Sequence, residues 1–350
     1  MKIKKRKLAV LESGYAVSML NWMKKSWYLA GSESENGVCL LIDRITGNAC
    51  LVEGIGGGIM AFVPIPEEEG TFIAIRKFYP VFRSENAEIV MVRLQKTDES
   101  ITGQVTVICR LPFVHRIALA GKAGCRKIIA ATLCSKKAYT DDWSSPGGIY
   151  EVSLDMAEKK APDLLLYDGL HKNHGMYTLQ EDGRNVILVS AQEGIIRLEE
   201  TEDESWSISK ISDIPAGDLW LYDVDGDGNE ELVVIEPFHG DTLGIYHLKE
   251  GAYSLVCHLP MNFGHVVWAG AILGDTYILG SSRGGDKNLV LHQVQATDGV
   301  IRFKTIVLSE GAGAAQALVI PETTRTCILT SDHAVGEITE IILEAEQEHV

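Results

Sequence analysis

Short apolar runs follow one another along the whole chain, and Gly, Asp, Asn, Ser or Pro bounds each of them. The clearest runs are VCLLI (38–42), IALA (117–120), KIIAATL (127–133), VILVS (186–190), ELVVIE (231–236), TYILGS (276–281), LVLHQV (289–294) and TCILTS (326–331). Runs of about 4–7 residues with this punctuation are typical of strands, and helical periodicity is scarce. The pattern predicts an all-β fold.

One segment repeats along the chain in looser form. Residues 217–248 read as strand, acidic turn, strand, loop and strand, and residues 173–199 keep the same order when Asp182 and Gly183 are placed on Asp227 and Gly228. Five further units lie upstream and downstream of these two, at roughly 45–60 residues each. This period suits four-stranded propeller blades. We therefore expect a single domain over residues 1–350, folded as a seven-bladed β-propeller of four-stranded antiparallel blades.

The two ends of the chain complement each other in this scheme. The final segment EITEIILEAEQEHV supplies only a third strand for the last blade, and KRKLAVLES near the start has no partner in the first blade. Because closure removes an exposed sheet edge, the N-terminal strand is expected to complete the last blade.

Composition indicates which binding partners and which cellular compartment to expect. The 350 residues carry a formal net charge of −16, which argues against a nucleic acid or an anionic membrane as the main partner. The seven cysteines form no CxxC pair, and the apolar stretch after the basic N-terminus is too short for a signal peptide. A cytoplasmic protein is expected.

The stretch DVDGDGNEE at 223–231 concentrates carboxylates around two glycines. Hard oxygen ligands at this density suit Ca²⁺, while the EF-hand alternative fails because position twelve of the loop is Val234. The stretch resembles the calcium loop of FG-GAP/VCBS propeller repeats, as in integrin α-chain propellers. That resemblance implies a structural calcium ion at a blade turn, on Asp223, Asp225, Asp227, Asn229 and Glu231; a bare acidic turn remains the alternative.

A second group of polar residues falls at strand ends that open on one predicted face. His115, His174 and His265 stand at or before first strands, and Lys136, His239, Arg283 and His333 follow second strands. His247, His258 and His292 lie inside strands and are excluded. Converging imidazoles suit a divalent transition metal or a general base, although each histidine alone is also compatible with a structural role.

Long loops add candidate substrate contacts. The insertion at 135–150 carries Trp143, which could stack on a sugar or pack on a neighbouring blade, and PFHGDTLGIYH at 237–247 places Asp241 beside His239. We expect His115, Trp143 and Asp241 to bind substrate.

The architecture also resembles two groups of carbohydrate-active propellers, aldos-2-ulose dehydratase and oligogalacturonate lyase. The resemblance implies metal-assisted β-elimination on a small carbohydrate, a keto-sugar or uronide, at the mouth of the central channel. In that hypothesis His174, His239, His265 and His333 hold a divalent ion (Mn, Zn or similar), and His174, His239, Arg283 and Lys136 serve catalysis. The alternative is a non-catalytic, calcium-stabilised propeller that binds a protein or glycan.

Overall fold

A computed structural model of the protein describes residues 1–154, 159–297 and 300–346. These residues contain strands, turns and bends and no helix, which confirms the all-β prediction, and none of them forms a helix that could cross a bilayer. Their contacts divide the chain into two compact units. Unit 1 comprises residues 1–10 and 216–350, and unit 2 comprises residues 11–215.

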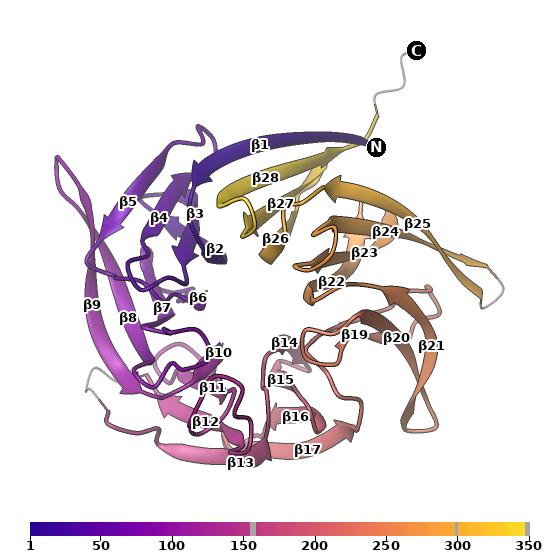
Figure 1. Ribbon diagram of the computed structural model, residues 1–350, viewed down its shortest axis with the longest axis horizontal. Coiled ribbons are helices and arrows are strands. Elements are labelled where there is room, and N and C mark those ends of the chain that lie inside the picture. Colours follow the sequence, from indigo (N-terminus) through magenta and orange to yellow (C-terminus); the bar gives the residue numbers. More distant parts are fainter. Residues whose placement is uncertain (155–158, 298–299, 347–350) are drawn as a thin grey trace. The chain divides into compact units, whose positions relative to one another are not determined.

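Unit 1 holds three four-stranded antiparallel sheets (Figure 1). The first runs in chain order through β18 (Asp218–Tyr222), β19 (Glu231–Glu236), β20 (Thr242–Lys249) and β21 (Ala252–Pro260). The second runs through β22 (Gly264–Ile272), β23 (Asp275–Ser282), β24 (Leu289–Thr297) and β25 (Val300–Ser309). The third has the order β1 (Lys2–Val10), β28 (Glu337–Glu344), β27 (Arg325–Asp332) and β26 (Ala314–Pro321).

Unit 2 holds two four-stranded sheets and one eight-stranded sheet. The four-stranded sheets are β10 (Val114–Ala120), β11 (Lys127–Thr132), β12 (Gly147–Ser153) and β13 (Leu164–Leu170), then β14 (Met176–Glu181), β15 (Arg184–Ala191), β16 (Gly194–Glu200) and β17 (Trp206–Ser212). The eight-stranded sheet joins two antiparallel groups through a short parallel pairing of β5 with β9. Its strands are β2 (Gly14–Trp22), β3 (Lys25–Ser32), β4 (Cys39–Asp43), β5 (Ala49–Glu53), β6 (Ala61–Pro64), β7 (Thr71–Arg76), β8 (Glu88–Lys96) and β9 (Ile101–Arg110).

Burial explains the sequence pattern from which the strands were predicted. The inner strands β11, β15, β19 and β23 are buried along most of their length, so they read as continuous apolar runs. The outer strands β21 and β25 are mostly exposed or half-buried and alternate in polarity. Within each unit, the first strands of successive four-stranded groups contact their neighbours: β18 contacts β22 and β22 contacts β26 in unit 1, and β2 contacts β6, β6 contacts β10 and β10 contacts β14 in unit 2.

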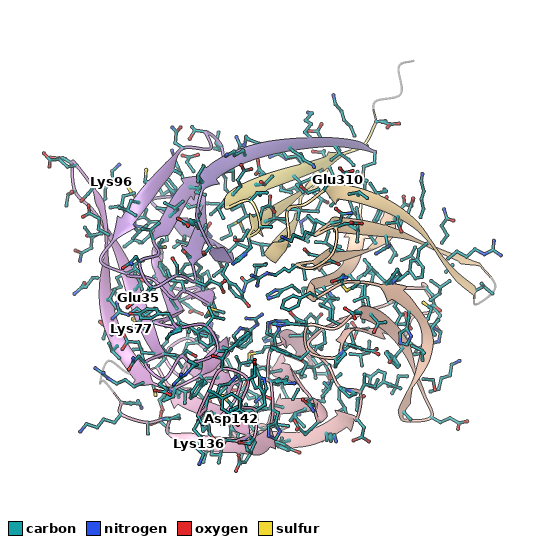
Figure 2. All side chains as sticks on the ribbon, in the orientation of Figure 1. Glu35, Lys77, Lys96, Lys136, Asp142 and Glu310 are labelled. Carbon is teal, nitrogen blue, oxygen red and sulfur yellow. The ribbon has the colours of Figure 1, made fainter. Side chains whose placement is uncertain are left out.

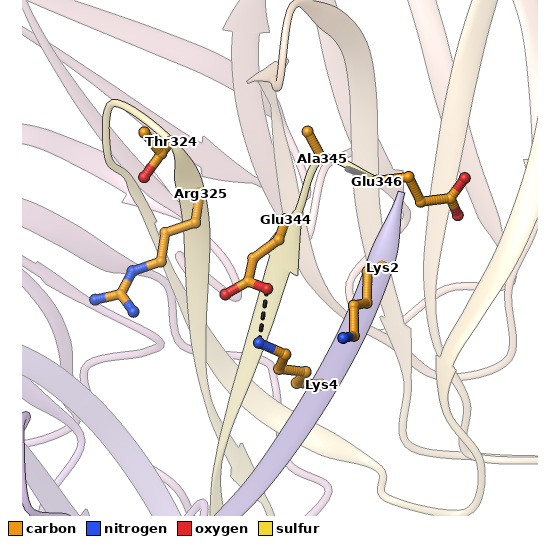
Figure 3. Close-up of a pocket in the computed structure, with 7 residues that line it drawn as sticks. All are labelled: Lys2, Lys4, Thr324, Arg325, Glu344, Ala345 and Glu346. Carbon is orange, nitrogen blue, oxygen red and sulfur yellow. Dashed lines mark ion pairs between the residues drawn. The ribbon is translucent and has the colours of Figure 1, made fainter. Parts of the chain in front are cut away.

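The N-terminal strand completes the last sheet, as predicted. β1 pairs antiparallel with β28 from Lys2 opposite Glu344 to Val10 opposite Glu337. A pocket of about 640 Å³ lies at this outer edge, and Figure 3 shows the ion pair of Lys4 with Glu344, 2.7 Å long, beside it. Backbone pairing covers an edge of β28 that would otherwise be exposed.

Three other predictions from the sequence have different outcomes. The acidic stretch lies between β18 and β19, the first two strands of one sheet, as expected. The seven-blade count stays a prediction, because two four-stranded groups share the eight-stranded sheet. A single domain over residues 1–350 also stays a prediction, and the two units are described separately.

Candidate functional site

The strand bounds place the candidate residues where the sequence pattern put them. His115 and His265 are the second residues of β10 and β22, and His174 lies two residues before β14. Lys136, His239, Arg283 and His333 follow β11, β19, β23 and β27. His115, Lys136, Trp143 and His174 belong to unit 2, and the others belong to unit 1. The four-histidine metal site therefore stays a prediction, and each group is described within its own unit.

In unit 1, His265 and Arg283 form a fixed pair. His265 is 3% exposed, and its Nδ1 donates a hydrogen bond of 2.7 Å to the carbonyl oxygen of Ala315. Its Nε2 accepts from Nη1 of Arg283 at 3.2 Å. Because an arginine can only donate, this pattern assigns a neutral imidazole with its proton on Nδ1. A metal ion at Nε2 would take the place of this hydrogen bond, and the role of His265 as a metal ligand stays a prediction.

His239 stands beside this pair on the loop after β19. Its backbone adopts the left-handed conformation, with φ of 52°. Its ring lies between Phe238, at a centroid distance of 3.9 Å, and Phe263, at 4.3 Å, and stacks on His265 at 5.1 Å. We call His239, His265 and Arg283 the histidine–arginine cluster.

Two other predicted residues of unit 1 lie near strand ends. Asp241 is exposed, and its Oδ1 accepts from the backbone N–H of Phe263 at 3.4 Å, which supports the turn before β22. Its predicted role in substrate binding stays a prediction. His333 is half-buried directly after β27, and its role as a metal ligand stays a prediction as well.

In unit 2, His115 and His174 lie together in the interior. Both are 2% exposed, and their ring centroids are 4.5 Å apart. Nε2 of His115 lies 3.3 Å from the hydroxyl of Tyr15, and Nδ1 lies 3.1 Å from Nη1 of Arg116. The guanidinium must donate to Nδ1, so Nε2 carries the proton. Arg116 was not among the predicted site residues, although its position next to His115 was visible in the sequence.

The loop that joins β11 to β12 spans residues 133–146, so the last four residues of the predicted insertion at 135–150 belong to β12 instead. This loop forms a cation–aromatic cluster. Lys136 is exposed, and Figure 2 labels it together with Asp142 of the same loop. The next residue, Lys137, is 6% exposed and holds its Nζ 3.2 Å from the ring centroid of Trp143. Burial lowers the pKa of Lys137. Trp143 also packs edge-on against Phe82 at 5.7 Å, in agreement with the alternative that this ring packs on a neighbouring segment.

In the acidic loop of unit 1, aspartate side chains accept hydrogen bonds from the backbone N–H groups of the loop itself. Asp223 accepts from the backbone N–H groups of Gly226 and Gly228, and Asp227 accepts from that of Asn229. One oxygen from each of Asp223, Asp225 and Asp227 lies within 4.8 Å of the others. Ligand oxygens at 2.3–2.6 Å from one Ca²⁺ have such separations, so these three carboxylates fit the predicted ion.

Glu231, at the start of β19, forms a second group with Asp225 and His247, in which one ligand atom of each lies within 4.8 Å of the others. Its side chain is buried, and burial raises its pKa to about 7, with the charges of Asp225 and Asp227 adding to the shift. A cation beside it would favour its ionised form. His247 on β20 also faces the loop, with Nε2 3.3 Å from Oδ2 of Asp225. The sequence analysis excluded His247, but Leu232 pairs with Tyr246, and this register brings His247 alongside Glu231.

Comparisons with known proteins bear on the fold. No protein-family model matches the chain, and no curated protein matches it. A candidate 6-phosphogluconolactonase from Bacteroides uniformis is similar in structure, with a TM-score of 0.55 at 11% identity over 95% of this chain and 97% of the other. A second one, from Bacteroides fragilis, has a TM-score of 0.51 at 12% identity over 95% and 96%.

The propeller of Dos1 is also similar, with a TM-score of 0.55 at 8% identity over 93% of this chain and 77% of the other. At these identities the likeness concerns the fold alone, and the FG-GAP/VCBS resemblance stays a prediction. The sheets described above and these structural neighbours agree: the chain has a β-propeller fold.

Proposed function

We propose that this protein is a carbohydrate-processing enzyme that acts on a uronide or a keto-sugar by β-elimination, at the histidine–arginine cluster of unit 1. The observation that carries the proposal is the pairing of Arg283 with His265 over 3.2 Å, beside the stacked ring of His239. A fixed cation next to a potential general base is the pair of groups that this reaction requires.

In this proposal Arg283 binds the substrate anion. Its guanidinium is planar and presents N–H donors in a rigid fork, and its Nη1 donates to His265. The fork can hold the carboxylate of a uronide or the carbonyl oxygen of a keto-sugar, and it stabilises the negative charge that develops there. His265 is a positioning residue, because its hydrogen bond to Ala315 fixes the ring that orients Arg283.

His239 is the proposed base. It takes the proton from the carbon next to the carbonyl or carboxylate, and the released electron pair forms the new C=C bond as the β-oxygen leaves. The leaving oxygen then takes a proton from solvent. His239 suits this task because its ring is only half-buried, between two phenylalanines, and an imidazole exchanges protons near neutral pH.

The sugar class rests on analogy. Two similar structures are named as candidate 6-phosphogluconolactonases, and both span nearly the whole chain. Those names support a carbohydrate substrate for this protein, while a shared fold alone does not fix the reaction. The calcium ion is proposed for the acidic loop as a structural ion, with Asp223, Asp225, Asp227, Asn229 and Glu231 around it.

Non-catalytic binding is the second candidate, and the acidic loop favours it. A calcium-stabilised propeller that binds a protein or glycan would need the loop but not the histidine–arginine cluster. A third possibility is a transition metal on His174, His239, His265 and His333. Elemental analysis of the purified protein distinguishes the third possibility from the first two: calcium alone is expected for either of those, and an added transition metal at His265 would require Arg283 to leave Nε2.

The decisive experiment screens uronides and keto-sugars for the ultraviolet absorbance of an unsaturated product. We expect product from the wild type, and a loss of about hundredfold or more in rate for His239→Gln and Arg283→Met. His258→Gln is the matched control, because His258 is 42% exposed on the outer strand β21. The proposal fails if no substrate yields an unsaturated product, or if the two cluster variants keep the wild-type rate.

A further inference from the structure

A second cavity of unit 1, whose lining does not include His239, His265 or Arg283, lies between the sheet β18–β21 and the sheet β22–β25. Its volume is about 470 Å³, within the range of roughly 300–1,000 Å³ that is usual for small-molecule sites. The lining comes from β20, β21, β23, β24 and β25, from the loop between β21 and β22 and from the loop between β23 and β24. We call it the intersheet cleft.

The floor of the intersheet cleft is apolar and includes one glycine. Leu243, Met261 and Val290 line it around Gly280 of β23. A Cβ atom at Gly280 would stand 3.4 Å from Cε of Met261, 3.8 Å from Val290 and 4.0 Å from Leu243, which are ordinary van der Waals distances. A Cβ atom is therefore accommodated at Gly280, and only side-chain atoms lie within 4 Å of it.

Hydroxyl, amide and imidazole groups line the rest of the cleft. Ser282, Asn262 and Asn288 line it near the loop, and His292 lines it with Thr305. His292 is 6% exposed, and its Nδ1 lies 2.8 Å from Oγ1 of Thr305. This buried imidazole can offer its other nitrogen, Nε2, to a ligand in the cleft.

The charges around the cleft balance each other. Asp286 and Lys287 are both exposed, lie next to each other on the loop and contribute one negative and one positive charge. His292 stays neutral near physiological pH, because burial lowers its pKa to about 4. A cleft with an apolar floor, several uncharged hydrogen-bonding groups and no net charge suits a neutral ligand with one apolar face and several hydroxyls.

We propose that the intersheet cleft binds a neutral hexose. The C–H face of the sugar ring would lie on Leu243, Met261 and Val290, and its hydroxyls would reach the amides of Asn262 and Asn288. The site is distinct from the proposed catalytic cluster but shares a loop with it, since Arg283 stands between Ser282 and Gly284, which both line the cleft. A sugar in the cleft would therefore contact the segment that carries Arg283.

The test measures binding of D-glucose, D-galactose and D-glucuronate separately, by saturation-transfer NMR and calorimetry on the full-length protein. We expect at least one neutral hexose to bind, and glucuronate to bind no more tightly than glucose. Gly280→Val should weaken hexose binding at least about tenfold, because its methyl groups occupy the floor. Melting temperature verifies that the variant is folded.

A second variant keeps the proposal falsifiable if valine at position 280 perturbs the sheet. Thr305→Val removes the hydroxyl that holds His292 and should weaken binding, whereas Thr276→Val, on β23 outside the cleft lining, should leave it unchanged. Failure of all neutral hexoses to bind, tighter binding of glucuronate, or binding that both cleft variants retain would overturn the proposal. None of these outcomes depends on lyase activity, because the cluster residues are intact in every variant.

Discussion

Arg283 donates from Nη1 to Nε2 of His265 over 3.2 Å, while Nδ1 of the same ring donates to the carbonyl of Ala315 over 2.7 Å. The imidazole thus links the loop after β23 to the start of β26 within unit 1. A ring that is held from both sides keeps one tautomer, and the guanidinium that it holds loses rotational freedom before any ligand arrives.

This relationship predicts the effect of a conservative replacement. Arg283→Lys keeps the charge but loses the planar fork, so kcat/KM on an anionic sugar should fall by about tenfold to hundredfold. Arg302→Lys, on the exposed part of β25, is the matched control and should leave it unchanged. Nitrogen NMR of the wild type should show the proton of His265 on Nδ1. A proton on Nε2 would contradict the assigned hydrogen bonds, whatever the activity.

The positions of the strands could be predicted from the sequence, because burial makes these segments apolar. ELVVIE became β19 and KIIAAT became β11, since a strand that is covered on both faces must be apolar throughout. The pairing of β1 with β28 followed from an unpaired edge at each end of the chain. These features depend on local pattern, which a single sequence contains.

The candidate site could be predicted only in part, because hydrogen-bond partners depend on distant segments. The placement of Arg283 and His265 at strand ends was correct, but nothing in the sequence indicated that Ala315 would hold the ring. Lys136 was preferred over Lys137, and only the structure reveals that the second lysine turns inward onto Trp143. Adjacent lysines look alike in sequence, and the direction of a loop decides which one is buried.

The second prediction concerns the calcium loop. Asp225→Ala and Asp227→Ala should each abolish the rise in melting temperature that calcium produces, because a ligand that binds only the folded state stabilises it by about 2.7 kcal/mol at a hundredfold excess over Kd. Glu230→Ala is the matched control, since Glu230 is exposed in the same loop and is outside the proposed ligand set. Calorimetric scans with calcium and with chelator check this. An unchanged calcium response in both aspartate variants would rule out this loop as the site.

The third prediction concerns the N-terminal strand. Removal of residues 1–12 should lower the melting temperature markedly, because β28 loses its backbone partners along the whole of β1. Single changes on β1 should separate buried from exposed ion pairs. Arg6→Ala leaves Glu340, which is 3% exposed, without this partner, whereas Lys4→Ala affects an exposed pair that contributes about 0–1 kcal/mol. Urea unfolding should therefore rank the deletion, Arg6→Ala and Lys4→Ala in that order of cost, and a truncated protein with the wild-type midpoint would refute the structural role of β1.

The last prediction concerns His292 and pH. Burial lowers its pKa from 6.5 to about 4 in the folded protein, so folding disfavours its protonated form. The stability that this group contributes is fully present above pH 6.5 and is lost as the pH falls through 4. At 1.36 kcal/mol per pKa unit, the loss amounts to about 3 kcal/mol at most.

His292→Gln removes the imidazole and should flatten this part of the stability curve. The comparison is the difference in unfolding free energy between wild type and variant at each pH, because the carboxylates contribute equally to both proteins. Gln295→Ala, at an exposed position of the same strand, serves as the control and should follow the wild type between pH 6.5 and 4, because neither side chain titrates. Denaturant titrations across this range give the two difference curves. Parallel curves for wild type and His292→Gln would mean that the ring is solvated in the folded protein, and the intersheet cleft would then be wetter than its apolar floor implies.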